Sequence, residues 1–509
     1  MPYQDSYVGH QPKNPDVIEY AGDYGLTSMT LINHDGDAID IKYLVQEINI
    51  YESIYNNSIT GTVVITDAID LIGNLPIQGT ERLEFKLKTP GTTESEHIID
   101  CSSESGHPVN IFKLTHKQQL DEHMQMYILH FCSREWLRNM RTRVSKSYNG
   151  TLDTMAAAIL GDKNGLDSRK TITTQKTRNQ DKIVIPNKQP FDAIDMLCKR
   201  ALADNSKSVG YYFYETTKGY QFRSWESMCV DARGLRRKPK QVFEVKTMNV
   251  VPKGNPHVDR KQQKTDSITD AYSSVENYQF LNQGHDVTVN TQLGTYGHRV
   301  ITHNIFSKSY KIDDYHYHNR FSESKHLDGN NPAIVASPVD YDNNSISDYP
   351  ESRISLQPTT QFLHDEDRGA VFGLNVLEEG RKLGQSIAQR AQVVHGTALR
   401  LVVKGQSYLE AGDVIDFKLR SVDEKNPDGE QDPQYSGKYV ITTIRHQINS
   451  NKYTMVLECA KDSVKTGFTK SNFKIPRNTN TATVRNTYQV ESGSTAEQDY
   501  LRSVRKQDR

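Results

Sequence analysis

The chain has 509 residues, with 62 basic against 63 acidic side chains and a formal net charge of −1. This balance gives no bulk electrostatic reason to bind nucleic acid or a membrane surface. The length predicts about two to four domains. We expect neither a membrane-spanning helix, which needs ~18 apolar residues in a row, nor a secretion signal at the polar N-terminus. Five widely spaced cysteines without a C-x-x-C pair predict reduced thiols in a protein assembled in the cytosol.

After an irregular arm, residues 1–24, a first β-domain is expected over residues 25–132. Apolar residues alternate with polar ones before and after the turn Asn56 to Ser58, which predicts a hairpin. Leu83, Phe85 and Leu87 give another strand one buried face, and Met124 to Phe131 a further strand. Together these strands predict a small barrel or sandwich.

Residues 133–235 have a mixed pattern that predicts an α/β insertion. Helices are expected to begin near Ser133, Thr151 and Pro190, each followed by apolar residues at helical spacing. Tyr211 to Tyr214 and Tyr220 to Arg223 predict a tight hairpin.

A charged linker is predicted over residues 236–271, and a second β-domain over 272–465. The second domain contains a polar surface excursion, residues 322–368, long enough to suggest either binding or partial disorder. A helix is expected where Leu377, Leu383, Ile387 and Ala391 share one face. The polar tail, residues 466–509, lacks strong periodicity and predicts a segment that orders on a partner.

One short pattern occurs twice. Gly79 precedes Glu84-Phe85-Lys86-Leu87, and Gly412 precedes Asp416-Phe417-Lys418-Leu419, more than 300 residues later. Two similar β-units at this distance indicate a duplicated architecture, with Phe85 and Phe417 at equivalent inner positions. The alternative is a chance likeness between two short amphipathic strands.

The two repeated regions also carry a family resemblance. Its residues are Thr66-Asp67-Ala68, Leu75 to Gly79, Ala411-Gly412-Asp413, Ser436 to Tyr439, His446, Lys461-Asp462-Ser463, and the central segments Pro190 to Ala201 and Tyr211 to Met228. Taken in their order along the chain, these segments resemble the central baseplate hub proteins of contractile-tailed bacteriophages. More distantly, they resemble the hub part of type VI secretion spikes.

The resemblance implies a mainly β fold in which an α/β insertion joins two tail-tube-like β-barrel or sandwich domains. It also implies a structural, non-enzymatic protein of the virion tail baseplate, assembled in the host cytoplasm. The implied homotrimer forms a pseudo-sixfold ring between the sixfold tail tube and the threefold central spike. Tape measure and baseplate wedge proteins are further implied partners. DNA would only pass through the lumen, and no stable membrane binding is expected.

Candidate chemical groups are few. His316 and His318 have the spacing of one strand face, but no second pair of metal ligands is evident. The acidic clusters His364 to Asp367 and Glu378-Glu379 offer the paired carboxylates of a glycosidase, although such clusters are commonly solvated. His446 is expected to make a structural hydrogen bond, and the basic run Arg233 to Lys240 to be an exposed linker.

The sequence therefore predicts no catalytic, cofactor-binding or metal-binding residue and no cofactor. Two other functions remain open at this stage. One is a tail-associated peptidoglycan hydrolase, and the other is a distal tail or receptor-binding protein.

Overall fold

The computed structural model describes residues 18, 21–75, 77–90, 98–178, 180–204, 206, 208–245, 268, 270–283, 286–305, 308–329, 331–336, 339–359, 396–421, 431–449 and 452–465. The chain divides into two units, Met1–Gly467 and Phe468–Arg509, and all described residues belong to the first. The predicted tail from residue 466, the helix expected near Leu377 and most of the N-terminal arm lie outside the described residues. No helix among those described is long and apolar enough to cross a membrane.

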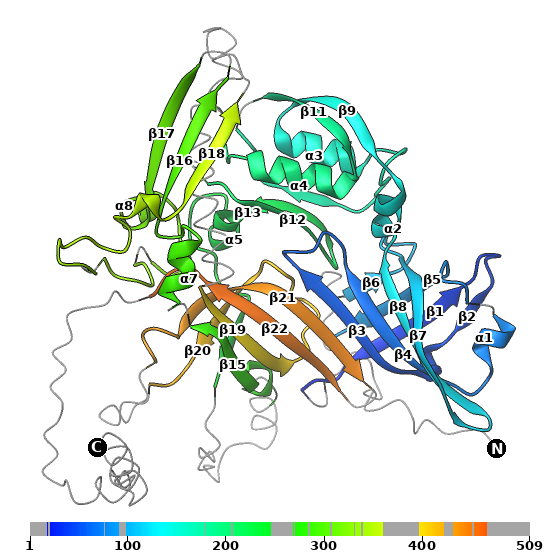
Figure 1. The fold of residues 1–509 in the computed structure, drawn as a ribbon. Helices are drawn as coiled ribbons and strands as arrows, with labels where there is room; N and C mark the ends of the chain where they lie inside the picture. The colour runs from blue at the N-terminus through cyan, green and yellow to red at the C-terminus, as the bar shows by residue number, and fades with distance from the viewer. Residues whose placement is uncertain are drawn as a thin grey trace, which may run out of the picture. The chain divides into compact units, whose positions relative to one another are not determined.

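The predicted mainly β class with an α/β insertion is confirmed. One 14-stranded sheet contains the strands of both β-units, in the order β15-β19-β22-β21-β3-β4-β8-β7-β5-β1-β2, with β6, β14 and β20 paired off this path. Its pairing order is open, so the described strands form no closed barrel. Figure 1 shows the blue strands of the first unit beside the orange strands of the second.

The first β-unit follows the predicted pattern closely. Its elements are β1 (Gly25–Ile32), β2 (Ala38–Asp40), a 3-10 turn at Lys42–Leu44, β3 (Val45–Ser53), β4 (Thr60–Asp67), α1 (Leu71–Asn74), β5 (Arg82–Lys88), β6 (Ile98–Cys101), β7 (Val109–Asp121) and β8 (Met124–Ser133). The expected hairpin is β3–β4, with Ile48 opposite Val63. Every second residue of β5 is buried, including Phe85 at 1% exposure, so the period of two does mark a one-sided core strand.

The insertion begins directly after β8. It consists of α2 (Arg134–Arg141), β9 (Val144–Gly150), α3 (Leu152–Leu160), β10 (Ile172–Thr174), β11 (Asp181–Lys188), α4 (Pro190–Arg200), β12 (Tyr211–Thr216), β13 (Gly219–Ser224) and α5 (Trp225–Cys229). The three predicted helix starts and the predicted hairpin, β12–β13, are confirmed. All six residues of β12 are buried, because the strand packs between the insertion's own core and the second β-unit.

The second β-unit contains β14 (Gln241–Glu244), β15 (Val275–Gln283), β19 (Thr397–Lys404), β20 (Val414–Lys418), β21 (Gly437–Asn449) and β22 (Tyr453–Lys461). Strand β14 falls within the predicted linker, which is a correction: it pairs in parallel with β20, placing the fully buried Phe243 opposite Phe417. Four residues are too few for a periodic signal, so only the sheet contacts reveal this strand.

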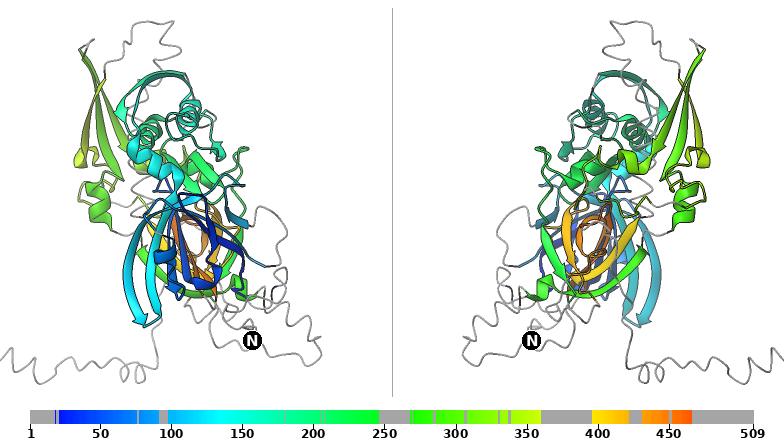
Figure 2. Two further views of the ribbon diagram at one scale, coloured as in Figure 1. Left: turned by 90° about the vertical axis from the view of Figure 1, so that its right-hand side faces the viewer. Right: turned by 90° about the vertical axis from the view of Figure 1, so that its left-hand side faces the viewer.

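The segment between β15 and β19 also differs from the expectation. It contains α7 (Val287–Gln292), β16 (Gly297–Asn304), β17 (Ser309–His316), α8 (Tyr317–Phe321), a 3-10 turn at Pro350–Ser352 and β18 (Ile354–Thr359). Strands β17, β16 and β18 form a separate three-stranded sheet with its own small core, drawn in green and apart from the blue and orange strands of the main sheet in Figure 2. Much of the predicted polar excursion therefore belongs to described structure, and a few of its residues, including His326 and Leu327, are buried.

The two β-units repeat one topology. Neighbouring strands follow the order β3-β4-β8-β7-β5 in the first unit and β15-β19-β22-β21-β20 in the second. Strands at the same place in these two orders also follow one another in the same order along the chain. Matching β-bulges lie between Ile111 and Lys113 in β7 and between Ile441 and Thr443 in β21. Such bulges are specific local features, so the repeat is more than a likeness of two amphipathic strands.

The register identifies equivalent residues. Leu83 lies opposite Val109, and Ile415 lies opposite Tyr439, at the same step of the two units. Phe85 and Phe417 each follow two residues later, and both are buried, at 1% and 0% exposure. The predicted equivalence of the two phenylalanines is confirmed, and one hydrophobic core runs through both units.

Candidate functional site: the junctions of the two β-units

The two β-units join edge to edge through β3 and β21. Seven residue pairs form the antiparallel contact, from Ser53 opposite Thr443 to Glu47 opposite Asn449. Side chains reinforce it: the Arg445 guanidinium donates to Asn49 Oδ1 at 2.9 Å, and the Gln447 amide donates to Glu47 Oε1 at 3.2 Å. The contact uses mainly backbone groups, which any sheet edge offers.

Glu52, fully buried at the end of β3, ties the insertion to both units. Its carboxylate accepts hydrogen bonds from the backbone N–H of Thr217 at 3.1 Å and of Ala411 at 3.3 Å. His446 Nε2 lies 3.7 Å from the same carboxylate, and His446 Nδ1 is 2.7 Å from the Tyr453 hydroxyl. The expected structural hydrogen bond of His446 is therefore present.

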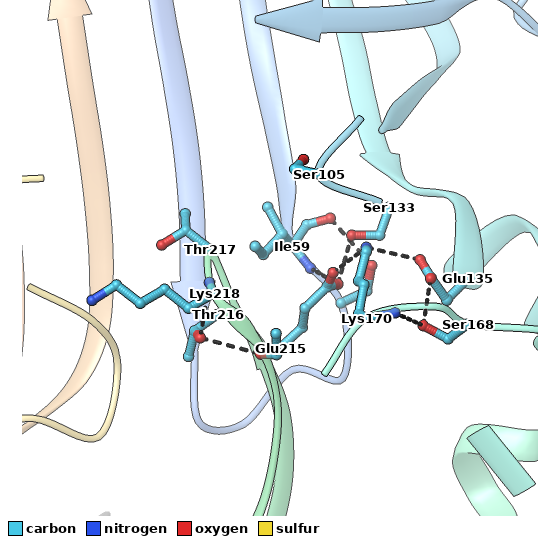
Figure 3. A network of polar contacts seen from close by, with 12 residues as sticks. Ile59, Ser105, Ser133, Glu135, Ser168, Lys170, Glu215, Thr216, Thr217 and Lys218 are labelled. Carbon is cyan, nitrogen blue, oxygen red and sulfur yellow. Dashed lines mark hydrogen bonds and ion pairs between the residues drawn. The ribbon is translucent and has the colours of Figure 1, made fainter. Parts of the chain in front are cut away.

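A buried ionic cluster holds the insertion against the first unit, as Figure 3 shows. Lys170 Nζ contacts Glu135 of α2 at 2.8 Å and Glu215 of β12 at 2.5 Å, and all three side chains are at most 3% exposed. The Glu215 carboxylate also accepts from the Ile59 backbone N–H at 2.9 Å and from the Ser133 hydroxyl at 2.5 Å. These contacts join the start of β4, the end of β8 and the insertion.

The charges of this cluster are interdependent. Burial raises the pKa of the Glu215 carboxyl, and the Glu135 carboxylate adds to this rise against the opposing effect of Lys170. Burial also opposes ionisation of Glu135, but Lys170 and Ser168 together hold its pKa below the usual value. Burial lowers the pKa of Lys170, but the two carboxylates raise it by more, so its pKa is above the usual value. Lys170 is thus an ammonium held between two acids, a contact that is costly to break.

The turn of the β12–β13 hairpin extends the contact to the second unit. The Thr216 hydroxyl donates to Glu410 Oε2 at 2.8 Å, and Lys218 Nζ lies 2.6 Å from Glu410 Oε1. Lys240 Nζ lies 2.8 Å from Asp413 Oδ2, and Arg237 donates to the Ser227 carbonyl at 2.9 Å. The basic run from Arg233 is thus not merely an exposed linker: its second half is bonded into the fold.

The second unit has a comparable junction at the end of β22, the counterpart of β8. Lys461 Nζ lies 3.3 Å from Asp328 and donates to the Ser436 carbonyl at 2.6 Å. The neighbouring Asp462 accepts from Trp225 Nε1 at 3.2 Å and pairs with His326 Nδ1 at 3.0 Å. In both units, the segments outside the five repeated strands are therefore bound at the end of equivalent strands, β8 in the first unit and β22 in the second.

The edges of β7 and β15 are among the strand edges of the main sheet that lack a partner in the described residues. Strand β7 pairs with β5 only at Val109 and Asn110, and along Lys113–Asp121 the edge away from β8 has no partner strand among the described residues. Strand β15 ends the main sheet and, within the same described set, pairs with β19 alone. Side chains from His116 to Asp121 and from Glu276 to Gln279 are exposed. Figure 2 shows the cyan β7–β8 hairpin extending past its neighbours.

The predicted candidate groups are dispersed. His316 ends β17, but His318 belongs to α8 rather than to the same strand, which corrects the expected shared face. Both histidines are hydrogen-bonded to Ser347: its carbonyl oxygen is 2.9 Å from His316 Nδ1, and its hydroxyl is 2.9 Å from His318 Nδ1. The acidic clusters at 364–367 and 378–379 lie outside the described residues. Within the described part, no group of three or more His, Cys, Asp and Glu side chains could hold a metal ion.

Sequence reasoning missed the Lys170 cluster. One signal was available, a glutamate at the end of the aromatic run Tyr211 to Tyr214, where a buried strand has no use for an unpaired charge. Its partners come from positions 45 and 82 residues away, Lys170 and Ser133. Nothing local in the sequence indicates that pairing. All five cysteines are free, as predicted, and the structure shows that all five are also buried.

The chain is similar to known phage tail proteins. No family model matches the chain. A probable baseplate hub protein of Vibrio phage KVP40 is 19% identical over 442 residues, which cover 84% of this chain and 92% of that protein. Among solved structures, a tail protein from Neisseria meningitidis has a TM-score of 0.48 at 9% identity, covering 87% of this chain and 97% of that one. A 43 kDa prophage tail protein from Shewanella oneidensis has a TM-score of 0.45 at 9% identity, covering 86% and 99%.

Proposed function

We propose that this baseplate-hub-like chain, similar to a phage hub protein along 84% of its length, is a structural adaptor in a phage tail. It acts as a homotrimer whose six β-units form one pseudo-sixfold ring. The observation that carries this proposal is the repeated five-strand topology within one chain, joined edge to edge through β3 and β21.

The symmetry argument follows from this duplication. Identical single-unit subunits cannot match a sixfold tube on one side and a threefold spike on the other. Three chains with two similar units each present six related surfaces upward and three identical surfaces downward. The insertion and the sheet of β16, β17 and β18 each occur once per chain, so they give the ring its threefold character.

The proposed partners follow from that position. The chain binds the tail tube on its sixfold side and the central spike on its threefold side, with tape measure and wedge proteins nearby. It resides in the virion tail after assembly in the host cytoplasm, and DNA passes through the lumen without stable binding. No catalytic role is part of the proposal.

Averaged electron-microscopy density of the tail tip tests this function. We expect a hub layer with three copies of this chain, and a layer with six copies or one copy contradicts the proposal. If the ring needs its tail partners to stay closed, the chain purified alone is expected to be a monomer. A zymogram on cell wall addresses the hydrolase alternative: clearing by the purified protein would replace the adaptor function with an enzymatic one.

A further inference from the structure

The joint between the units inside one chain is a template for a joint between chains. Strand β21 has a divided outer edge: its first residues pair with β20, and Thr443–Asn449 pair with β3. Strand β7 is its counterpart, and its first residues likewise pair with β5. The remainder of the β7 edge, Lys113–Asp121, is the part left open among the described strands.

The strand that would cover this edge can be identified by the same correspondence. Strand β3 is the first strand of its unit, antiparallel to β4, with a bulge between Val45 and Glu47. Strand β15 is the first strand of the other unit, antiparallel to β19, with a bulge between Val275 and Asn277. Its free edge corresponds to the edge through which β3 binds β21.

We propose that β15 of one copy pairs with the second half of β7 of the next copy, antiparallel and in the register of β3 on β21. This rests on the trimeric ring proposed above and names the contact that closes it. Each chain then contributes one joint within itself and one joint to a neighbour. The joints link the six β-units into one continuous sheet that covers the open edges of β7 and β15, which removes the aggregation hazard that these two exposed edges carry.

The register follows from paired neighbours. Gln447 lies opposite Thr454 of β22, and Gln118 lies opposite Met126, its counterpart position on β8. Asn49 lies opposite Thr62, and Gln279 lies opposite Arg400, the counterpart on β19. Because Asn49 faces Gln447 inside the chain, Gln279 of one copy is expected to face Gln118 of the next. One step along, Tyr278 faces Gln119.

The side chains at these positions suit the contact. Inside the chain, polar pairs reinforce the joint: Gln447 with Glu47, and Arg445 with Asn49. The equivalent pairs between copies are Gln118 with Asn277, and Thr115 with Gln279, which are amides and a hydroxyl that can donate and accept in the same way. Exposed Tyr278 adds an aromatic side chain over the new neighbour.

Cysteine cross-linking in assembled tails tests the register. Tails carrying Gln118→Cys together with Gln279→Cys are expected to yield covalent dimers and trimers of this chain on a non-reducing gel, because opposite residues lie within disulfide distance. The native cysteines are buried, so the background is low. Gln118→Cys alone, and Ala38→Cys with Gln279→Cys, are the controls; the second probes closure through β2, the opposite end of the sheet.

The outcomes separate this contact from the function. A trimeric hub layer whose tails cross-link through Ala38 and Gln279, or through neither pair, overturns the β7–β15 joint and leaves the adaptor intact. A layer that is not trimeric overturns the function itself. If both cysteine variants fail to assemble, density at strand resolution in unmodified tails decides: β15 of a neighbour along β7 supports the inference, and any other strand there refutes it.

Discussion

Strands β7 and β21 occupy the same place in the two β-units and have the same length, 13 residues, yet their second halves differ. In β21 the second half is covered by β3, and alternate residues such as His446 and Ile448 are buried. In β7 the second half is polar and exposed, and it contains His116 in a left-handed conformation at φ 54°. The same topology therefore has two kinds of strand edge. The edge of β21 is paired with β3 within the chain, and the edge of β7 is available to a neighbouring chain.

Other differences are internal exchanges. Gly61 lies opposite Phe131 in the first unit, and the equivalent pair in the second is Leu399 opposite Cys459. The large side chain has moved from one strand to the next, so the pair keeps one large and one small member. A reversal occurs at the outer strand, where β1 is antiparallel to β5 but β14 is parallel to β20. The duplicated core therefore tolerates changes that preserve volume and pairing.

The largest expected effect comes from the repeated phenylalanines. Phe85→Ala and Phe417→Ala are each expected to lower the free energy of unfolding by about 3–5 kcal/mol, because each removes a fully buried ring. Chemical denaturation of the purified variants measures this. Lys418→Ala, on the opposite face of β20, is the control and is expected to change little. If neither phenylalanine variant loses stability, the two rings do not share a duplicated core position.

The ionic cluster distinguishes the first unit from the second. Lys170→Met is expected to destabilise the fold by about 3–5 kcal/mol, because it leaves Glu135 and Glu215 buried without their counter-ion. Adding Glu215→Gln is expected to recover part of that loss. Lys163→Met, at an exposed position, is the matched control. Equal denaturation midpoints for Lys170→Met and the control would contradict a structural role for the cluster.

The exchange at Gly61 can be tested by making one unit resemble the other. Gly61→Leu alone is expected to cost about 1–3 kcal/mol or more, since a Cβ there would meet Phe131 Cζ at 2.1 Å and the Asn49 carbonyl oxygen at 2.3 Å. Combined with Phe131→Cys, it is expected to cost less than the sum of the two single changes. A thermodynamic double-mutant cycle measures this coupling, and strict additivity would show that the two positions do not compensate.

The smallest expected effect is a pH dependence in the second unit. Burial opposes the charge on His326, but Asp462 at 3.0 Å holds the histidine's pKa above its usual value. The ion pair and hydrogen bonds of Asp462 keep its own pKa low despite burial. The pair therefore stabilises the fold fully below the unfolded histidine's pKa of about 6.5, while Asp462 is ionised, and loses this as pH rises through the folded pKa.

Urea unfolding of the wild type between about pH 5.5 and 8.5 is expected to show a loss of about 1–2 kcal/mol from this pair. His326→Gln is expected to lack that component of the pH dependence while keeping a polar side chain at the site. A variant whose stability falls with pH just as steeply as that of the wild type would assign the slope to other groups.

The amino-acid sequence by itself determined the mainly β class, the helix starts of the insertion, the β3–β4 and β12–β13 hairpins and the equivalence of Phe85 and Phe417. The class, the helix starts and the hairpins depend on periodicity or turn chemistry within about a dozen residues, and the equivalence of the two phenylalanines depends on a short pattern that occurs twice. The tertiary structure decided what local patterns do not encode: the β3–β21 joint, the strand β14 within the predicted linker, the separate sheet β16–β18 and the Lys170 cluster. These features pair residues tens to hundreds of positions apart. Their stability comes from burial and edge pairing after the chain has folded, so no local spacing predicts them.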